Sequence, residues 1–357
     1  MIQLDGRYGE GGGALVRTAL ALSTLTGKSF EVKDIRAGRP NPGLKAQHLT
    51  AINALKEITG AETNKIFLGS TGLSFIPGRV KRGIYNIDIG TAGSITLLLQ
   101  ALILPCLFAP GKITLTIKGG TCGKWQASVD YLQNILLPQL NRFVEKIELK
   151  IIKRGYYPKG SGEVKLEICP RRSGNLEEIG SKYAEINLTK QGKLEQIKGI
   201  INLSTELQEK EVASRIKIAA ESALKRYNAP INFRIEQTAS LSPGGEVLLY
   251  ALFSSNHQID PDNPVILASD ALIEKGKRSE EIGQEAAERL VKEISSNAAA
   301  DHYLADQLIQ FMALLPGSKI STSSVSNHAL TNIYVAEKFL AVQFKVSNNL
   351  IAVSGIE

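Results

Sequence analysis

Residues 90–120 read GTAGSITLLLQALILPCLFAPGKITLTIKGG and contain the unit from which the rest of the chain is built. A glycine-rich opening comes before an apolar stretch at 95–108, which predicts a helix. A Pro-Gly turn follows, and residues 112–117 predict a strand. A second helix at 127–140 completes the unit.

The same order of elements occurs in two other parts of the chain. The first copy opens with Gly9-Glu10-Gly11-Gly12-Gly13, and its predicted elements are a helix at 15–25, a strand at 29–35 and a helix at 44–58. The third copy has lost the glycine opening, and its predicted elements are a helix at 305–315, a strand at 319–324 and a helix after His328. Further strands are predicted between the copies, at 72–77, 85–89, 148–152 and 163–169. Three occurrences of one order predict a repeat-built α/β (α+β) fold, in which each unit packs two helices against a small sheet.

The region from 184 to 274 interrupts the third copy. It is richer in Lys and Glu, and it has its own predicted strand, helix and two more strands, at 199–203, 210–226, 231–236 and 247–254. We therefore predict a large domain of residues 1–183 and 275–357, with a small α/β domain inserted at 184–274.

Composition limits the class of protein. A net charge of +7 favours an acidic partner such as a nucleic acid or a nucleotide. The three cysteines form no CxxC pair, which argues against structural zinc and fits a reducing cytosol, so we expect a cytoplasmic location. The longest apolar run, 95–109, is too short to span a bilayer, and the polar N-terminus shows no signal peptide, so we expect no membrane partner.

The segment Ser326-Asn327-His328-Ala329-Leu330-Thr331-Asn332 puts a histidine directly before an amphipathic run. Imidazole is both a nucleophile and a leaving group near neutral pH, so a histidine at a helix start can carry a covalent intermediate. The N-terminus of a helix also favours a phosphate. The alternative is a histidine that only caps the helix or packs against it.

Two loops have the residue types that bind phosphate. The Gly9–Gly13 loop combines backbone amides at a helix start with Arg17, which suits a phosphate, and with Glu10, which suits a bridging metal. Arg36 and Arg39 lie on a loop stiffened by glycine and proline, from which guanidinium groups can fork onto phosphate oxygens. A tight structural turn and a solvated charged loop are the alternatives.

Polar and aromatic residues in apolar surroundings pose a similar choice. Gln100 lies within an apolar helix and needs hydrogen-bond partners, which a ligand or the protein itself can supply. Asp306 and Gln307 pose the same choice, and Tyr303 can stack on a base or pack in the core. The segment 154–162 interleaves basic, aromatic and glycine residues, which suits either a nucleic-acid backbone or a hairpin turn.

Taken together, these residues resemble the RNA 3'-terminal phosphate cyclase family along nearly the whole chain. The segments that carry the resemblance are Asp5-Gly6 with Gly9–Gly13, Arg36-Ala37-Gly38-Arg39 with Pro42-Gly43-Leu44, Gln47-His48-Leu49, Gly90-Thr91-Ala92-Gly93-Ser94, Arg154–Gly160, Tyr303–Gln307, and His328 with Leu330-Thr331-Asn332.

The resemblance implies a fold of three repeated two-helix, four-strand units with a small inserted domain. It implies a reaction in which a histidine attacks the α-phosphorus of ATP and becomes adenylylated. The AMP then passes to an RNA 3'-phosphate, and the neighbouring 2'-hydroxyl displaces it to leave a 2',3'-cyclic phosphate. ATP is the implied co-substrate, Mg²⁺ or Mn²⁺ the implied metal, and RNA with a 3'-terminal phosphate the implied partner.

The resemblance also implies roles for individual residues, with His328 as the nucleophile and Glu10 as the metal contact. The residues implied to line the ATP site are Gln100, Tyr303, Leu304, Ala305, Asp306 and Gln307. Those implied to hold the terminal phosphate are Arg17, Arg36, Arg39 and Gln47. The inserted region holds none of these residues, so we expect the remainder to fold and react with ATP without it.

The chain departs from the family pattern at two points. A glycine triplet common in the family reads Gly160-Ser161-Gly162 here, so Ser161 is strained if this position requires a positive φ. Prolines that the family often has under the adenine are absent near 126–128. Two alternative functions remain. One is a non-catalytic relative in ribosomal RNA processing, against which His328 argues, and the other is an enolpyruvyl transferase of the same fold, indicated only by 90–94.

Overall fold

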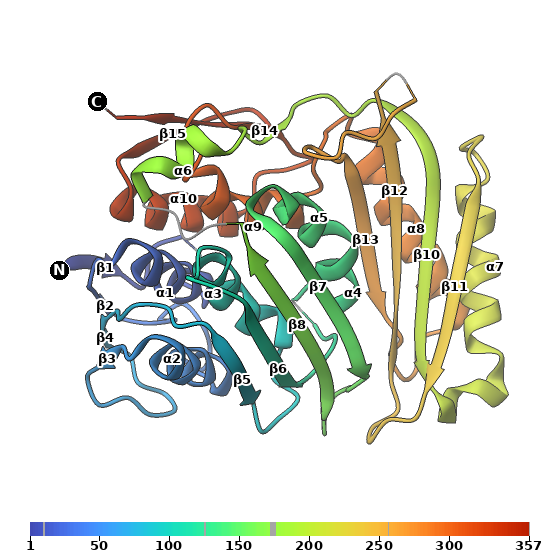
Figure 1. The fold of residues 1–357 in the computed structure, drawn as a ribbon. Helices are drawn as coiled ribbons and strands as arrows, with labels where there is room; N and C mark the ends of the chain where they lie inside the picture. Colours follow the sequence, from blue (N-terminus) through green and yellow to red (C-terminus); the bar gives the residue numbers. More distant parts are fainter. Residues whose placement is uncertain (10, 125, 172–175, 256, 357) are drawn as a thin grey trace.

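The computed structural model describes residues 1–9, 11–124, 126–171, 176–255 and 257–356. Within these residues the strands form four sheets of four strands each, with helices packed on them (Figure 1). This combination confirms the predicted α/β fold class.

The first sheet has the strand order β1-β2-β4-β3, and its unit contains the helices α1 and α2 (Figure 1). Gly27 and Gly60 end these helices in the left-handed conformation, which glycine adopts without strain. The elements are β1 (Ile2–Asp5), α1 (Ala14–Thr26), β2 (Phe30–Lys33), α2 (Ala46–Thr59), β3 (Glu62–Thr63) and β4 (Leu73–Ile76).

The second sheet has the order β5-β6-β8-β7, and a π-helix interrupts its second helical segment. The sequence predicts one continuous helix at 127–140, but Pro138 has no N–H to donate to the preceding turn, which favours a wider turn. The elements are β5 (Gly83–Asp88), α3 (Ile95–Leu107), β6 (Ile113–Gly119), α4 (Val129–Tyr131), the π-helix η1 (Leu132–Leu136), α5 (Leu137–Leu140), the 3₁₀ turn η2 (Asn141–Phe143), β7 (Val144–Lys153) and β8 (Gly162–Pro170).

The third sheet has the order β15-β16-β14-β9, and its strands come from both sides of a long excursion of the chain. The elements are α6 (Leu176–Lys182), β9 (Asn187–Leu188), α9 (His302–Met312), β14 (Lys319–Ser321), α10 (Asn327–Phe339), β15 (Val342–Ser347) and β16 (Leu350–Gly355).

These three sheets share one topology. In each, the first two strands in chain order pair in parallel, the second pairs antiparallel with the fourth, and the fourth pairs antiparallel with the third. The fourth sheet differs, with the order β11-β10-β12-β13. Its elements are β10 (Lys193–Ser204), the 3₁₀ turn η3 (Thr205–Lys210), α7 (Val212–Leu224), β11 (Ile231–Thr238), β12 (Gly245–Ser254), β13 (Ile266–Leu272) and α8 (Ser279–Ser295).

The strand β12 of the fourth sheet is buried on both faces. Because side chains alternate along a strand, Leu248 and Ile266 pack into the main core, while Val247 and Leu249 pack into a second core with α7 and α8. The helix α8 begins beyond residue 274, so it extends past the predicted end of the inserted region. The predicted domain limits stay a prediction, but the shared core argues against the expectation that the remainder folds without this region.

None of the helices formed by the described residues has the length and apolar composition needed to cross a bilayer.

Candidate active site

His328 is the second residue of α10 and is half-buried at the start of that helix. The Ser326 side chain caps the helix, because its Oγ accepts a hydrogen bond of 3.0 Å from the Ala329 amide. The remaining amides of the first turn make this end of α10 attractive to an anion. The expectation that His328 opens a helix is therefore confirmed.

Asp306 links α10 to α9. The Ser326 hydroxyl donates to Oδ1 of Asp306 at 2.5 Å, and the Asn332 amide group donates to the Asp306 carbonyl at 2.8 Å. The Thr18 hydroxyl of α1 in turn donates to Oδ1 of Asn332 at 2.7 Å. Three helices from two different units are thus held in one arrangement around the start of α10.

Arg17 and Gln100 connect the first unit to the second. The Arg17 Nε donates to Oε1 of Gln100 at 2.8 Å, and the Arg17 side chain is buried. The resemblance assigns Arg17 to the terminal phosphate and Gln100 to ATP, and the fold brings these two residues into direct contact. The side-chain oxygen of the half-buried Gln100 therefore has a protein partner, and its NH2 group is a donor that a ligand could use.

His48 lies next to Arg17, although the sequence assigned it no role. A Cβ atom placed on Gly13 would lie 2.4 Å from Nε2 of His48 and 2.9 Å from Nη1 of Arg17. The Nδ1 atom accepts from the Lys45 amide at 3.0 Å, while the buried Nε2 has no hydrogen-bond partner among the described residues. Burial, assisted by Arg17 and Arg36, lowers the pKa of His48 to about 3, so the ring is neutral with its proton on Nε2. In the sequence, only its place in the segment Gln47-His48-Leu49 indicated that His48 lies near the site.

The loop that carries Arg36 and Arg39 contacts the glycine-rich loop of the first unit. A Cβ on Gly11 would lie 3.1 Å from the Gly38 amide nitrogen. The Arg36 Nη1 donates to the carbonyl groups of Asn41 and Gly43 at 2.7 and 3.2 Å, so this guanidinium closes its own loop, while Arg39 is exposed.

Gln47 faces the glycine-rich loop of the second unit. Its Cβ lies 3.8 Å from the position that a Cβ on Gly93 would take. The fold therefore brings the start of α2 next to the opening of the second unit, where Gln47 is half-buried.

The predicted ATP-site residues on α9 do not all point the same way. Leu304 and Ala305 are fully buried in the main core, so their side chains serve packing. Tyr303 and Gln307 are half-buried, and the Gln307 amide donates to the Tyr303 carbonyl at 3.1 Å. His302 packs on Tyr303 with ring centroids 4.0 Å apart.

The start of α9 rests on the fourth sheet and on α8. Asp301 caps α9 by accepting from the Leu304 amide, and its other oxygen accepts from the Ala268 amide of β13 at 3.0 Å. The His302 Nδ1 lies 2.8 Å from Oε1 of Glu293 in α8. Burial lowers the pKa of His302, but Glu293 and Asp301 outweigh it, so the pKa is raised overall.

Glu10, the predicted metal contact, lies outside the described residues. Within the part of the chain that the structure describes, no group of three or more His, Cys, Asp or Glu side chains could hold a metal ion. The requirement for Mg²⁺ or Mn²⁺ therefore stays a prediction.

The hypothesis that the segment 154–162 tracks a nucleic acid is wrong for Arg154. Its guanidinium is buried between the second and fourth sheets and pairs with Asp130, Glu236 and Glu246. Residues 156 and 160 pair as in a hairpin, which agrees with the alternative.

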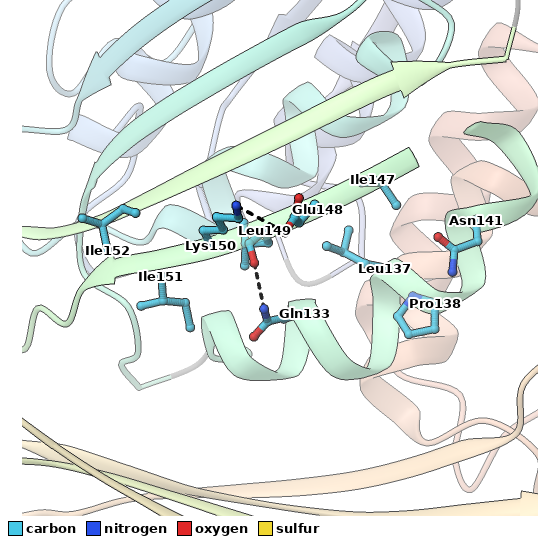
Figure 2. A pocket seen from close by; sticks show the side chains of 10 residues that line it. All are labelled: Gln133, Leu137, Pro138, Asn141, Ile147, Glu148, Leu149, Lys150, Ile151 and Ile152. Carbon is cyan, nitrogen blue, oxygen red and sulfur yellow. Dashed lines mark hydrogen bonds and ion pairs between the residues drawn. The ribbon is translucent and has the colours of Figure 1, made fainter. Parts of the chain in front are cut away.

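A separate pocket of about 570 Å³ lies between β7 and the π-helix (Figure 2). The Gln133 amide donates to the Leu149 carbonyl at 2.8 Å across it, which satisfies part of the edge of β7. The residues that line this pocket include none of the predicted site residues.

Comparison with known proteins agrees with the resemblance. Residues 8–346 match the family model described as RNA 3'-terminal phosphate cyclase. A protein of Archaeoglobus fulgidus with that name is 40% identical over 357 residues, covering 99% of this chain and 100% of its own length. Proteins of the same name from Pyrococcus furiosus and Thermococcus gammatolerans are each 39% identical, cover 98% of this chain, and are themselves covered over 96% and 95% of their lengths.

Proposed function

Because the chain belongs to the RNA 3'-terminal phosphate cyclase family, we propose that it converts the 3'-terminal phosphate of RNA to a 2',3'-cyclic phosphate through a histidine–AMP intermediate. The observation that carries the proposal is the position of His328. It lies at the capped start of α10, with Asp306 of α9 bonded to the capping residue.

The reaction has three steps. An imidazole nitrogen of His328 attacks the α-phosphorus of ATP, and pyrophosphate leaves with the electron pair of the broken P–O bond. An oxygen of the RNA 3'-phosphate then attacks the same phosphorus, and the histidine leaves. Finally the 2'-hydroxyl loses its proton and attacks the 3'-phosphorus, and AMP leaves. Adenylylation is needed because a phosphate monoester offers the neighbouring hydroxyl no competent leaving group.

The neighbours of His328 suit these steps. Nucleotidyl transfer depends on positioning and on neutralising charge more than on a strong base. The amides at the start of α10 and the Arg17 guanidinium offer positive charge to phosphate oxygens. In this proposal Tyr303, Gln307 and Gln100 contact ATP, while Arg39, Arg36 and Gln47 lie toward the RNA terminus. A Mg²⁺ or Mn²⁺ ion held by Glu10 would neutralise phosphate charge.

The buried Nε2 of His48, which has no hydrogen-bond partner among the described residues, supports a phosphate near Arg17. A protonated histidine beside two arginines would be costly to bury, whereas a neutral ring keeps one Nε2–H donor available. The buried donor without a partner thus agrees with a site whose acceptor arrives with the substrate.

Labelled ATP tests the covalent step. The protein is incubated with ATP labelled on the α-phosphate and separated on a denaturing gel. We expect protein-bound label that is lost in acid and kept in alkali, as a phosphoramidate requires. His328→Ala should abolish it, and His302→Ala should retain it. Labelling that survives in His328→Ala but disappears in His302→Ala would show that His302, and not His328, is the nucleophile.

The product is tested separately with RNA that ends in a 3'-phosphate. We expect its terminal phosphate to become resistant to phosphatase and RNA with a 3'-hydroxyl to stay unchanged. Label on the protein without any cyclised RNA would limit the proposal to its first step.

A further inference from the structure

An exposed and a half-buried aromatic ring form a stack next to the proposed site. Tyr8 and Tyr334 lie face to face, with ring centroids 4.0 Å apart and planes inclined by 14°. Tyr8 is 42% exposed, although it already packs against a second ring. The Lys338 Nζ lies 5.6 Å from the centre of the Tyr334 ring and adds a positive charge to the group.

The stack joins the glycine-rich loop of the first unit to α10, the helix that carries His328. Tyr334 is six residues beyond His328 on α10, a rise of about 9 Å along the helix. Tyr8 directly precedes the glycine-rich loop, and its carbonyl accepts from the Gly11 amide at 3.2 Å. The same loop contacts α10 at Gly9, where a Cβ would lie 2.3 Å from Oγ1 of Thr331.

The glycine-rich loop also contacts the loop that carries Arg39, through Gly11 and Gly38. An RNA whose terminal phosphate lies between Arg39 and the start of α10 therefore has Tyr8 within its immediate surroundings. The remaining nucleotides of such an RNA would need exposed protein surface beside the site, and Tyr8 offers an exposed ring there.

We propose that Tyr8, backed by Tyr334, is a stacking platform for a nucleobase near the 3' end of the RNA. The inference rests on the proposed function and adds a contact for the body of the substrate. A base can stack on an aromatic ring whatever its identity, so the platform strengthens binding without selecting a sequence. Lys338 supplies charge that is complementary to the RNA backbone.

The alternative is that the two rings only anchor the glycine-rich loop to α10. Both explanations need the ring of Tyr8, but only stacking on RNA depends on a base in the substrate. Tyr8→Leu keeps apolar bulk against Tyr334 and removes the flat aromatic face, and Tyr8→Phe keeps the face and removes only the hydroxyl group.

The test combines these variants with RNAs that end in a 3'-phosphate and lack one base at a time near that end. With intact RNA, Tyr8→Leu should raise KM about thirtyfold, the middle of the range for a stacked base, while Tyr8→Phe stays near the wild type. One abasic RNA should show the same rise with the wild type, and combining it with Tyr8→Leu should add nothing.

Two controls make the outcome unambiguous. Formation of the protein–AMP adduct should be equal in all three proteins, because the platform does not contact ATP. Binding of the same RNAs, measured by fluorescence anisotropy without ATP, should show the same base dependence. A Tyr8→Leu protein that binds every RNA like the wild type, or losses that simply add, would overturn the platform. Base-dependent binding without cyclised product would instead count against the proposed function.

Discussion

The Ser326 hydroxyl donates a hydrogen bond of 2.5 Å to Oδ1 of Asp306, and this bond ties the start of one helix to the middle of another. The same hydroxyl oxygen accepts from the Ala329 amide, so a single side chain caps α10 and sets its position relative to α9. In the proposed reaction, this bond fixes His328 relative to the residues that hold ATP.

Removing the Ser326 hydroxyl should therefore slow formation of the AMP adduct while lowering the unfolding free energy only modestly. We expect Ser326→Ala to cost about 1 kcal/mol of unfolding free energy, the usual effect of losing an N-cap. It should also slow formation of the AMP adduct, which Ser326→Thr should restore. Ser326→Thr is the matched control, because it keeps the hydroxyl that caps α10 and bonds to Asp306. Single-turnover labelling and urea unfolding measure both quantities, and equal labelling rates in Ser326→Ala and the wild type would contradict the expectation.

The two arginines of the first loop should behave differently. Arg39→Ala should slow conversion of the RNA terminus by about 10- to 100-fold, the value of a charge-assisted hydrogen bond, and leave the AMP adduct intact. Arg36→Ala removes in addition the bonds to the Asn41 and Gly43 carbonyls, so it should also loosen the loop. Limited proteolysis measures that loosening. Arg278→Ala is a control for lost charge, because the Arg278 side chain is 80% exposed. If the two substitutions block formation of the AMP adduct as strongly as cyclisation, both arginines act in the ATP site and not at the RNA terminus.

Acid should destabilise the protein through His48. Its pKa is about 3 in the folded state, below its ordinary value of 6.5, so the unfolded chain takes up the proton first. The stability that this group contributes is present above pH 6.5 and is lost as pH falls toward 3. Between pH 7 and 5, wild type should lose about 2 kcal/mol more than His48→Gln. Urea unfolding at both pH values measures the difference, and parallel losses would show that His48 does not titrate as described.

Ser161 offers a gain in stability. Its φ is +62°, which is strained for a residue with a Cβ, as the sequence anticipated. Ser161→Gly should raise the unfolding free energy by about 1 kcal/mol. Asn348→Gly, at a φ of +53°, should gain less because asparagine tolerates this conformation. Equal gains in the two variants would mean that the serine is not specially strained.

The sequence predicted what depends on local pattern. The glycine openings and the apolar runs indicated α1 and α3, and the position of His328 before an amphipathic run indicated the start of α10. Asp306 and Gln100 were identified as residues that need partners, and the structure supplies those partners from other helices.

What the sequence did not predict depends on contacts between distant segments. No local pattern distinguishes the buried Arg154 from an arginine that binds nucleic acid, because its partners Asp130 and Glu246 lie elsewhere in the chain. The same holds for His48, whose environment is made by Arg17 and Gly13. Support of α9 by the fourth sheet also arises only in the folded chain.

The buried charges around Arg154 have a consequence for strand register. Apolar residues line both faces of β12, so a slip by one residue would exchange Leu248 and Leu249 between two cores that are both apolar. Hydrophobicity alone therefore distinguishes poorly between the correct alignment and the slipped one. Glu246 does distinguish them, because a slip would turn it away from Arg154 and leave a buried guanidinium without one of its hydrogen-bond acceptors. A cluster that adds little net stability thus selects the one alignment in which the fourth sheet fits the rest of the molecule.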